Sequence, residues 1–107
     1  MGTLRHIVLF SFKAEASGEQ VDEIVGKFLA LEGSIDVVRG FEWGLNVSPE
    51  DLHQGLSHCF TITFDSLEDL DIYQNHPAHL AFVADLQAIL DKVLVVDYLV
   101  NASPANI

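Results

Sequence analysis

Residues 4–13 form the segment that most restricts how this chain can fold. Side chains alternate along it as they do in a β-strand, and both sides of the alternation hold large apolar groups. One side has Leu4, Val8, Phe10 and Phe12, and the other has Ile7 and Leu9. A strand that is apolar on both faces has to be covered on both, so one layer of helices cannot complete the fold.

The rest of the chain predicts two helical regions and three further strands. Apolar residues recur at helical spacing from Ser17 or Gly18 to about residue 33, and they alternate again at residues 41–47 and 56–64. A second helical region starts at Ser66, which has Asp69 at capping-box spacing, and it continues to about residue 90. A strand rich in β-branched residues follows at 93–100.

Pro77 divides the second helical region. Proline cannot continue a helix, and it disfavours helical angles at the residue before it, His76. The sequence therefore predicts a short helix before Pro77 and a longer helix that restarts there, with His76 as an N-cap or loop residue.

These elements follow the order β-α-β-β-α-β, which is typical of an α+β, ferredoxin-like domain with a mixed, largely antiparallel sheet and both helices on one face. We expect one domain over residues 1–107, with its core at about 4–100. The other face of the sheet would present Ile7, Leu9 and either Val95 and Leu99 or Val96 and Val100. We therefore expect a homodimer in which two sheets pack face to face over about 1,200 Å² or more.

The charge of the chain narrows the choice of partners. Sixteen carboxylates stand against five Lys and Arg residues, which gives a formal net charge of -11. Such a surface repels nucleic acid and anionic lipid, so neither is expected as a partner, and the lack of a long apolar run suggests a cytoplasmic protein. A single cysteine, Cys59, excludes an internal disulfide and a Cys-rich metal site. No glycine-rich phosphate loop is present, and we expect neither a cofactor nor a bound transition metal.

Five titratable residues lie on faces that are otherwise apolar. They are His6, His58, Tyr73, His79 and Asp97. A buried carboxylate is costly unless it is paired, and the topology offers His79 as a partner for Asp97. That pairing would fix the tautomer of the imidazole and leave its second ring nitrogen free to take a proton. Each residue alone also fits a satisfied core position, and it is their convergence from several elements that points to a site.

Four segments of the chain are HIVLFSFK, GFEWG, SHCFTITFDSLEDLDIYQNHPAH and VVDYL. With them the chain resembles the stress-responsive dimeric α/β-barrel (Dabb) family over residues 4–100. The resemblance implies a ferredoxin-like protomer in a two-chain barrel. Most of that family has no known activity, but one plant member closes a linear polyketide by aldol condensation without a cofactor.

The resemblance also implies roles for individual residues. His79 and Tyr73 match the catalytic histidine and tyrosine of that enzyme, and Asp97 matches its supporting aspartate. Two cavity histidines correspond to His6 and His58, whereas Phe28 replaces a tyrosine and Phe60 replaces a small aliphatic residue in the pocket lining. A different substrate is therefore expected. Some members also hold magnesium through backbone carbonyls, which would fall near Glu32, Ile35 and Val38.

Three functions remain open from the sequence. The first is a homodimer that binds a small, mostly apolar carbonyl compound, and the second is a cofactor-free enzyme in which His79 removes a proton and Tyr73 donates one. The third is a purely structural dimer. An open cavity near His79 and Tyr73 would favour the first two, and a space closed by Phe28, Phe60 and Phe82 would favour the third.

Overall fold

The computed structural model describes residues 2–101. The elements are β1 (Leu4–Phe12), α1 (Gly18–Leu29), α2 (Leu31–Ser34), β2 (Gly40–Leu45), β3 (His58–Phe64), α3 (Leu67–Asn75), α4 (Pro77–Leu86) and β4 (Leu90–Leu99). The order is the predicted β-α-β-β-α-β, with each helical region split into two helices. The prediction of an α+β, ferredoxin-like fold is confirmed.

The sheet has the strand order β2-β3-β1-β4, and each neighbouring pair in it is antiparallel. The expectation of a mixed sheet was wrong for a topological reason. Each helical connection joins strands that are not neighbours, because β3 lies between β1 and β2, and β1 lies between β3 and β4. The strands that run parallel are therefore never adjacent.

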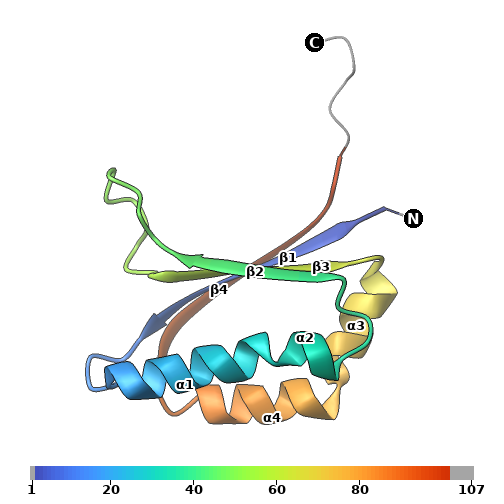
Figure 1. The fold of residues 1–107 in the computed structure, drawn as a ribbon. Coiled ribbons are helices and arrows are strands. Elements are labelled where there is room, and N and C mark those ends of the chain that lie inside the picture. Colours follow the sequence, from blue (N-terminus) through green and yellow to red (C-terminus); the bar gives the residue numbers. More distant parts are fainter. Residues whose placement is uncertain (1, 102–107) are drawn as a thin grey trace.

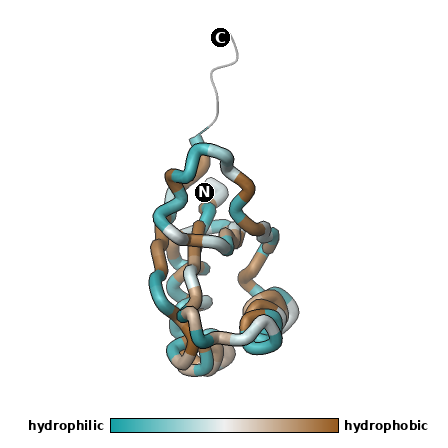
Figure 2. The backbone as a smooth tube through the Cα atoms, turned by 90° about the vertical axis from the view of Figure 1, so that its left-hand side faces the viewer, coloured by the Kyte–Doolittle hydropathy of each residue, from teal (hydrophilic) through white to brown (hydrophobic). Residues whose placement is uncertain are grey.

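All of the helices lie on one side of the sheet, as Figure 1 shows. In the end-on view of Figure 2 the helices and the strands form separate layers. Strand β1 turns alternate side chains toward the helices, and those of Leu4, His6, Val8 and Phe10 are buried. The helix-facing side of β1 therefore includes one histidine in an otherwise apolar row.

The ends of the helices follow local signals in the sequence. Ser17 forms a capping box with Gln20 and begins α1. His76 has extended backbone angles, ends α3, and accepts a hydrogen bond from the backbone N–H of Ala78 as the N-cap of α4. The predicted break at Pro77 is confirmed, and His76 is the N-cap of the restarted helix.

The strands predicted at 41–47, 56–64 and 93–100 are observed with shifted ends, as Gly40–Leu45, His58–Phe64 and Leu90–Leu99, and two predicted helix ends also differ from the structure. The first helix does not run unbroken to residue 33, because the chain leaves α1 at Ala30 and then makes the short helix α2. Helix α4 ends at Leu86 and does not reach residue 90; Ile89 nevertheless packs into the core, and β4 already begins at Leu90. Apolar spacing continues across both turns, which is why periodicity alone did not reveal them.

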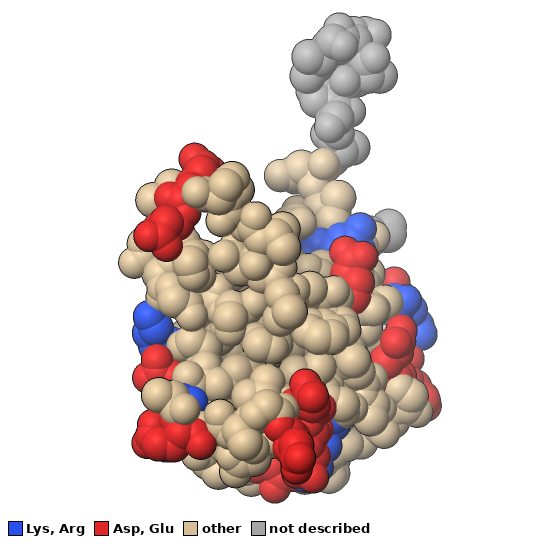
Figure 3. Space-filling model, turned by 60° about the vertical axis from the view of Figure 1, so that its left-hand side comes forward, with Lys and Arg blue, Asp and Glu red and all other residues tan. Residues whose placement is uncertain are grey.

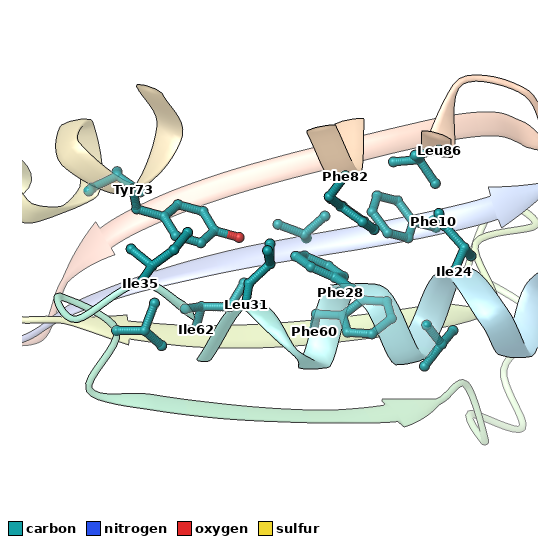
Figure 4. Close-up of a cluster of buried hydrophobic side chains, with 14 of the residues drawn as sticks. Phe10, Ile24, Phe28, Leu31, Ile35, Phe60, Ile62, Tyr73, Phe82 and Leu86 are labelled. Carbon is teal, nitrogen blue, oxygen red and sulfur yellow. The ribbon is translucent and has the colours of Figure 1, made fainter. Parts of the chain in front are cut away.

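Aromatic rings fill the space between the helices and the sheet (Figure 4). Phe28 of α1 stacks on Phe82 of α4 with ring centroids 4.5 Å apart and planes 13° apart. The ring centroid of Phe28 also lies 4.7 Å from that of Phe60 of β3. The ring centroid of Phe10 of β1 lies 5.4 Å from the same Phe60 centroid. These rings connect both long helices to the two central strands.

The opposite face of the sheet has no helices over it. The register pairs Ile7 with Val96 and Leu9 with Leu94, so Val96, and not Val95, lies on this outer face. Strand β4 is an edge strand, and its apolar side chains from Val93 to Leu99 are about half exposed on both faces. The expected apolar outer face is therefore present.

Carboxylates predominate among the charged side chains, and the face in Figure 3 shows them mostly around a broad uncharged middle. Among residues 2–101, no helix is long and apolar enough to span a bilayer.

Replacing Phe60 by alanine tests the aromatic packing. The Phe60 side chain is fully buried, so Phe60→Ala should lower the free energy of unfolding by about 3–5 kcal/mol. Leu52→Ala, at a site that is 67% exposed, should change it by less than about 0.5 kcal/mol. Urea unfolding at one fixed protein concentration measures both free energies. Similar losses of unfolding free energy in the two variants would contradict the assignment of Phe60 to the core.

Candidate functional site

His6 and Asp97 form a hydrogen-bonded pair beneath the helices. They lie directly opposite each other on β1 and β4, and the His6 Nδ1 and Asp97 Oδ1 atoms are 2.5 Å apart. The His6 side chain is almost fully buried, and that of Asp97 is about one third exposed. Since a carboxylate only accepts, His6 donates its Nδ1–H and keeps Nε2 as the ring nitrogen that can take a proton.

The sequence predicted that Asp97 would pair with His79, but in the structure Asp97 pairs with His6. The β1–β4 register places Asp97 beside His6 and fixes its nearest partner within the sheet. His79, in the first turn of α4, has its Nδ1 3.0 Å from the backbone oxygen of Gln74. A carbonyl can only accept, so His79 also holds its proton on Nδ1 and leaves Nε2 free.

Burial lowers the pKa of His79 below its ordinary value. The hydrogen bond to the Gln74 carbonyl opposes this shift, and the nearby His6 adds to it. His79 is therefore a neutral imidazole at neutral pH. The Gln74 carbonyl fixes its tautomer, which is the task that the sequence assigned to Asp97.

Tyr73, near the end of α3, lies behind the two histidines. Its ring centroid is 4.6 Å from that of His79 and 6.0 Å from that of His6. The side chain is fully buried, and its hydroxyl has no hydrogen-bond partner among residues 2–101. Figure 4 shows this hydroxyl pointing into the layer between helices and sheet. Burial raises the pKa of Tyr73, so the phenol stays protonated and can act as a donor.

An open cavity adjoins this cluster, between α4, α1 and the β1–β4 side of the sheet. Its volume is about 210 Å³. Among its lining residues are His6, Phe28, His79, Phe82, Val83 and Val95. Tyr73 and Phe60 are fully buried behind this wall, and Phe28 is the aromatic residue of the predicted lining that reaches the cavity. The aromatic rings thus narrow the space without closing it.

His58 lies apart from the other four polar residues. It pairs with Phe10, whereas His6 pairs with Ile62, and four residues along a strand correspond to about 13 Å. Its ring stacks on Trp43 at 6.0 Å, and its Nδ1 is 2.8 Å from the Ser57 hydroxyl. His58 lines a larger hollow of about 580 Å³ beside the β2–β3 connection. The structure therefore brings together His6, Tyr73, His79 and Asp97, and separates His58 from them.

Side chains that could hold a metal are not grouped in the described part of the chain, residues 2–101. At the turn where the resemblance implied magnesium, the carbonyl of Ile35 accepts a hydrogen bond from the backbone N–H of Val38 at 3.1 Å. The Leu31, Ile35 and Val38 side chains around it are buried and apolar. The side chains do not bear on a site made of backbone carbonyls, so the magnesium implied by the resemblance stays a prediction, and no step proposed below uses a metal.

Sequence reasoning missed three contributors to the site. Gln74 acts through its backbone oxygen, which leaves no trace in the residue type. Val83 and Leu86 line the cavity, and their helical spacing had indicated only core positions. Apolar side chains on the sheet-facing side of a helix can line a cavity, and not only the core, where the sheet beneath them ends in an edge strand.

The free energy of unfolding should fall as the pH drops below 6.5, the ordinary pKa of histidine. The unfolded chain takes up protons there, whereas folded His79 resists protonation, so its stabilising effect is complete above that pH and is lost below it. Burial lowers the pKa of His58 as well, which adds an effect of the same sign. The free energy of unfolding, measured in urea at about pH 8 and at about pH 5.5, should differ less between the two pH values for His79→Gln than for the unchanged protein. An equal difference would contradict the role of His79.

A model of the "Stress responsive A/B Barrel Domain" matches residues 4–100. Stress-response A/B barrel domain-containing protein HS1 of Arabidopsis thaliana is 42% identical over 97 residues, which cover 91% of this chain and 89% of that protein. Olivetolic acid cyclase of Cannabis sativa is 28% identical over 95 residues, which cover 89% of this chain and 94% of that enzyme.

Solved structures of other proteins superpose on this chain as well. The hydroxynitrile lyase of Passiflora edulis superposes with a TM-score of 0.89 at 27% identity, over 95% of this chain and 96% of the lyase. A protein of Bacteroides fragilis, described as dimeric, of unknown function and with a ferredoxin-like fold, superposes with a TM-score of 0.74 at 30% identity, over 94% of this chain and 98% of that one. The family match spans nearly the whole chain and agrees with the fold, and the chain therefore belongs to the stress-responsive A/B barrel (Dabb) family.

Proposed function

We propose that this protein is a homodimer that binds a small, mostly apolar carbonyl compound in the cavity between α4 and the sheet. The observation that supports this most directly is the cavity itself, which has aromatic and aliphatic walls and two imidazoles, those of His6 and His79. Pockets for drug-sized ligands usually measure about 300–1,000 Å³, so a volume of about 210 Å³ suits a smaller compound.

A second candidate function is cofactor-free proton transfer in the same cavity. Its support is the close packing of Tyr73 and His79, together with the tautomer that leaves Nε2 of His79 free. In this reaction His79 removes a proton next to the carbonyl, and Tyr73 donates to the oxygen that becomes negative. Because the Tyr73 hydroxyl lies buried behind the cavity wall, this donation requires a movement of the lining that exposes it. The cyclase and the lyase among the similar proteins are enzymes, which supports chemistry on this fold.

The homodimer follows from the outer face of the sheet. An apolar patch is formed there by Ile7, Leu9, Leu94 and Val96, and its exposure to water is unfavourable. The Bacteroides fragilis protein with the same fold is described as dimeric. A second copy of the chain would cover this patch with an equal one.

Light scattering should give a mass of about twice 11.8 kDa at micromolar concentration. Val96→Lys, at a residue 49% exposed on the outer face, should shift the mass toward the monomer because it places a charge in the interface. Leu80→Lys, 55% exposed on α4, is the matched control and should leave the mass unchanged. A monomeric unchanged protein would contradict the dimer.

Ligand binding can be tested with phenylacetone, a small ketone with an apolar ring. Titration monitored by backbone amide NMR should give saturable shifts at residues that line the cavity. Val83→Phe should abolish them by filling the cavity, whereas Leu80→Phe, on the exposed side of the same helix, should preserve them. Comparable shifts in both variants would place binding elsewhere, and a lack of binding to the unchanged protein would favour the structural dimer.

A further inference from the structure

The two imidazoles of the cavity have different partners on Nδ1. His6 donates to the carboxylate of Asp97, and His79 donates to the neutral carbonyl of Gln74. Both rings hold their proton on Nδ1 and leave Nε2 unprotonated, and both residues line the cavity. Only one of them, therefore, has a negative charge placed to balance the positive charge that protonation creates.

We propose that His6, held by Asp97, is the residue that accepts the proton in this cavity, and that His79 remains a neutral hydrogen-bond acceptor. The inference rests on the proposed proton transfer and reassigns its base. In the step, the C–H bond next to the carbonyl breaks, its proton moves to Nε2 of His6, and the electron pair passes to the carbonyl oxygen as an enolate. The imidazolium and the Asp97 carboxylate then form an ion pair, and the proton returns to carbon in the reverse step.

The difference between the two Nδ1 partners decides which ring takes the proton. Hydrogen bonds with an ionised partner are roughly twice as strong as neutral ones, and an adjacent opposite charge favours the charged form of a group. His6 Nδ1 lies 2.5 Å from the Asp97 carboxylate, which gives His6 an ionised hydrogen-bond partner. The Gln74 carbonyl contributes only a dipole to His79.

The surroundings of His79 oppose a positive charge on it. His79 lies in the first turn of α4, where the positive end of the helix dipole disfavours a cation. Burial and the neighbouring His6 both lower the pKa of His79, so a proton on His6 further reduces protonation of His79. Tyr73, the other titratable group packed against both rings, is a neutral phenol. A single positive charge is thus accommodated beside Asp97.

Hydrogen exchange of phenylacetone in heavy water measures this step without knowledge of the natural substrate. The unchanged protein should accelerate replacement of the protons next to the carbonyl. His6→Asn should lower that rate by about 100-fold or more, which is the usual contribution of a general base. The isosteric Asp97→Asn should lower it by about 10-fold or more, and His79→Asn by less than either. His53→Asn, in the β2–β3 connection, is the matched control and should leave the rate unchanged.

Nitrogen NMR of the imidazole rings separates a positioning role of Asp97 from a structural one. At alkaline pH the ring of His6 should hold its proton on Nδ1, and Asp97→Asn should give a mixture of tautomers, whereas the His79 ring should be unaffected. An unchanged His6 tautomer in Asp97→Asn would overturn the role of Asp97.

The outcomes distinguish the inference from the proposed function. If His79→Asn abolishes exchange and His6→Asn retains it, the assignment of His6 is overturned and the proton transfer stands with His79 as its base. If the unchanged protein does not accelerate exchange of a bound phenylacetone, proton transfer itself is overturned, and binding alone remains. Circular dichroism and thermal unfolding of each variant ensure that a lost rate reflects chemistry and not lost folding.

Discussion

The register of β1 against its two neighbours determines which side chains meet beneath the helices. Strand β1 lies between β3 and β4, and the pairing places His6 opposite Ile62 on one side and opposite Asp97 on the other. A slip by one residue would turn every side chain of β1 to the other face, which would expose Val8 and Phe10 and bury Arg5. The same constraint that forms the core thus creates the polar pair at its edge.

The position of β4 at the edge of the sheet explains why the core is not closed at this point. Helices α1 and α4 pack over the central strands through Phe28 and Phe82, and they leave β4 about half exposed on its helix-facing side. The cavity opens in the space between α4 and this strand. On the outer side, the same strand adds apolar surface to that of β1. One uncovered strand therefore contributes both to the cavity and to the patch proposed as the dimer interface.

The sequence predicted the fold well because its signals are local. The alternation at residues 4–13, the capping residues Ser17 and Ser66, and Pro77 each act on their own segment, and together they define the order of elements. The partner of Asp97 could not be predicted, because β4 is apolar on both faces and its register against β1 has no pattern to fix it. The partner of His79 is a backbone oxygen, which every residue type offers.

The polar residues gathered at the cavity are difficult to explain as packing alone. His6 and Tyr73 lie in a layer that is otherwise filled by aromatic and aliphatic groups, and Asp97, about one third exposed on the edge strand, borders it. A buried polar side chain such as that of His6 does not add to stability by its polarity, since apolar side chains of similar volume are often as good or better, and the unpartnered buried hydroxyl of Tyr73 is itself unfavourable. A core selected only for stability would have little use for this arrangement. The carbonyl compound proposed for the cavity would need an acceptor, a charge held nearby and a donor. The histidines that line the cavity and Asp97 beside His6 supply the first two, and the Tyr73 hydroxyl behind the wall is the candidate for the third.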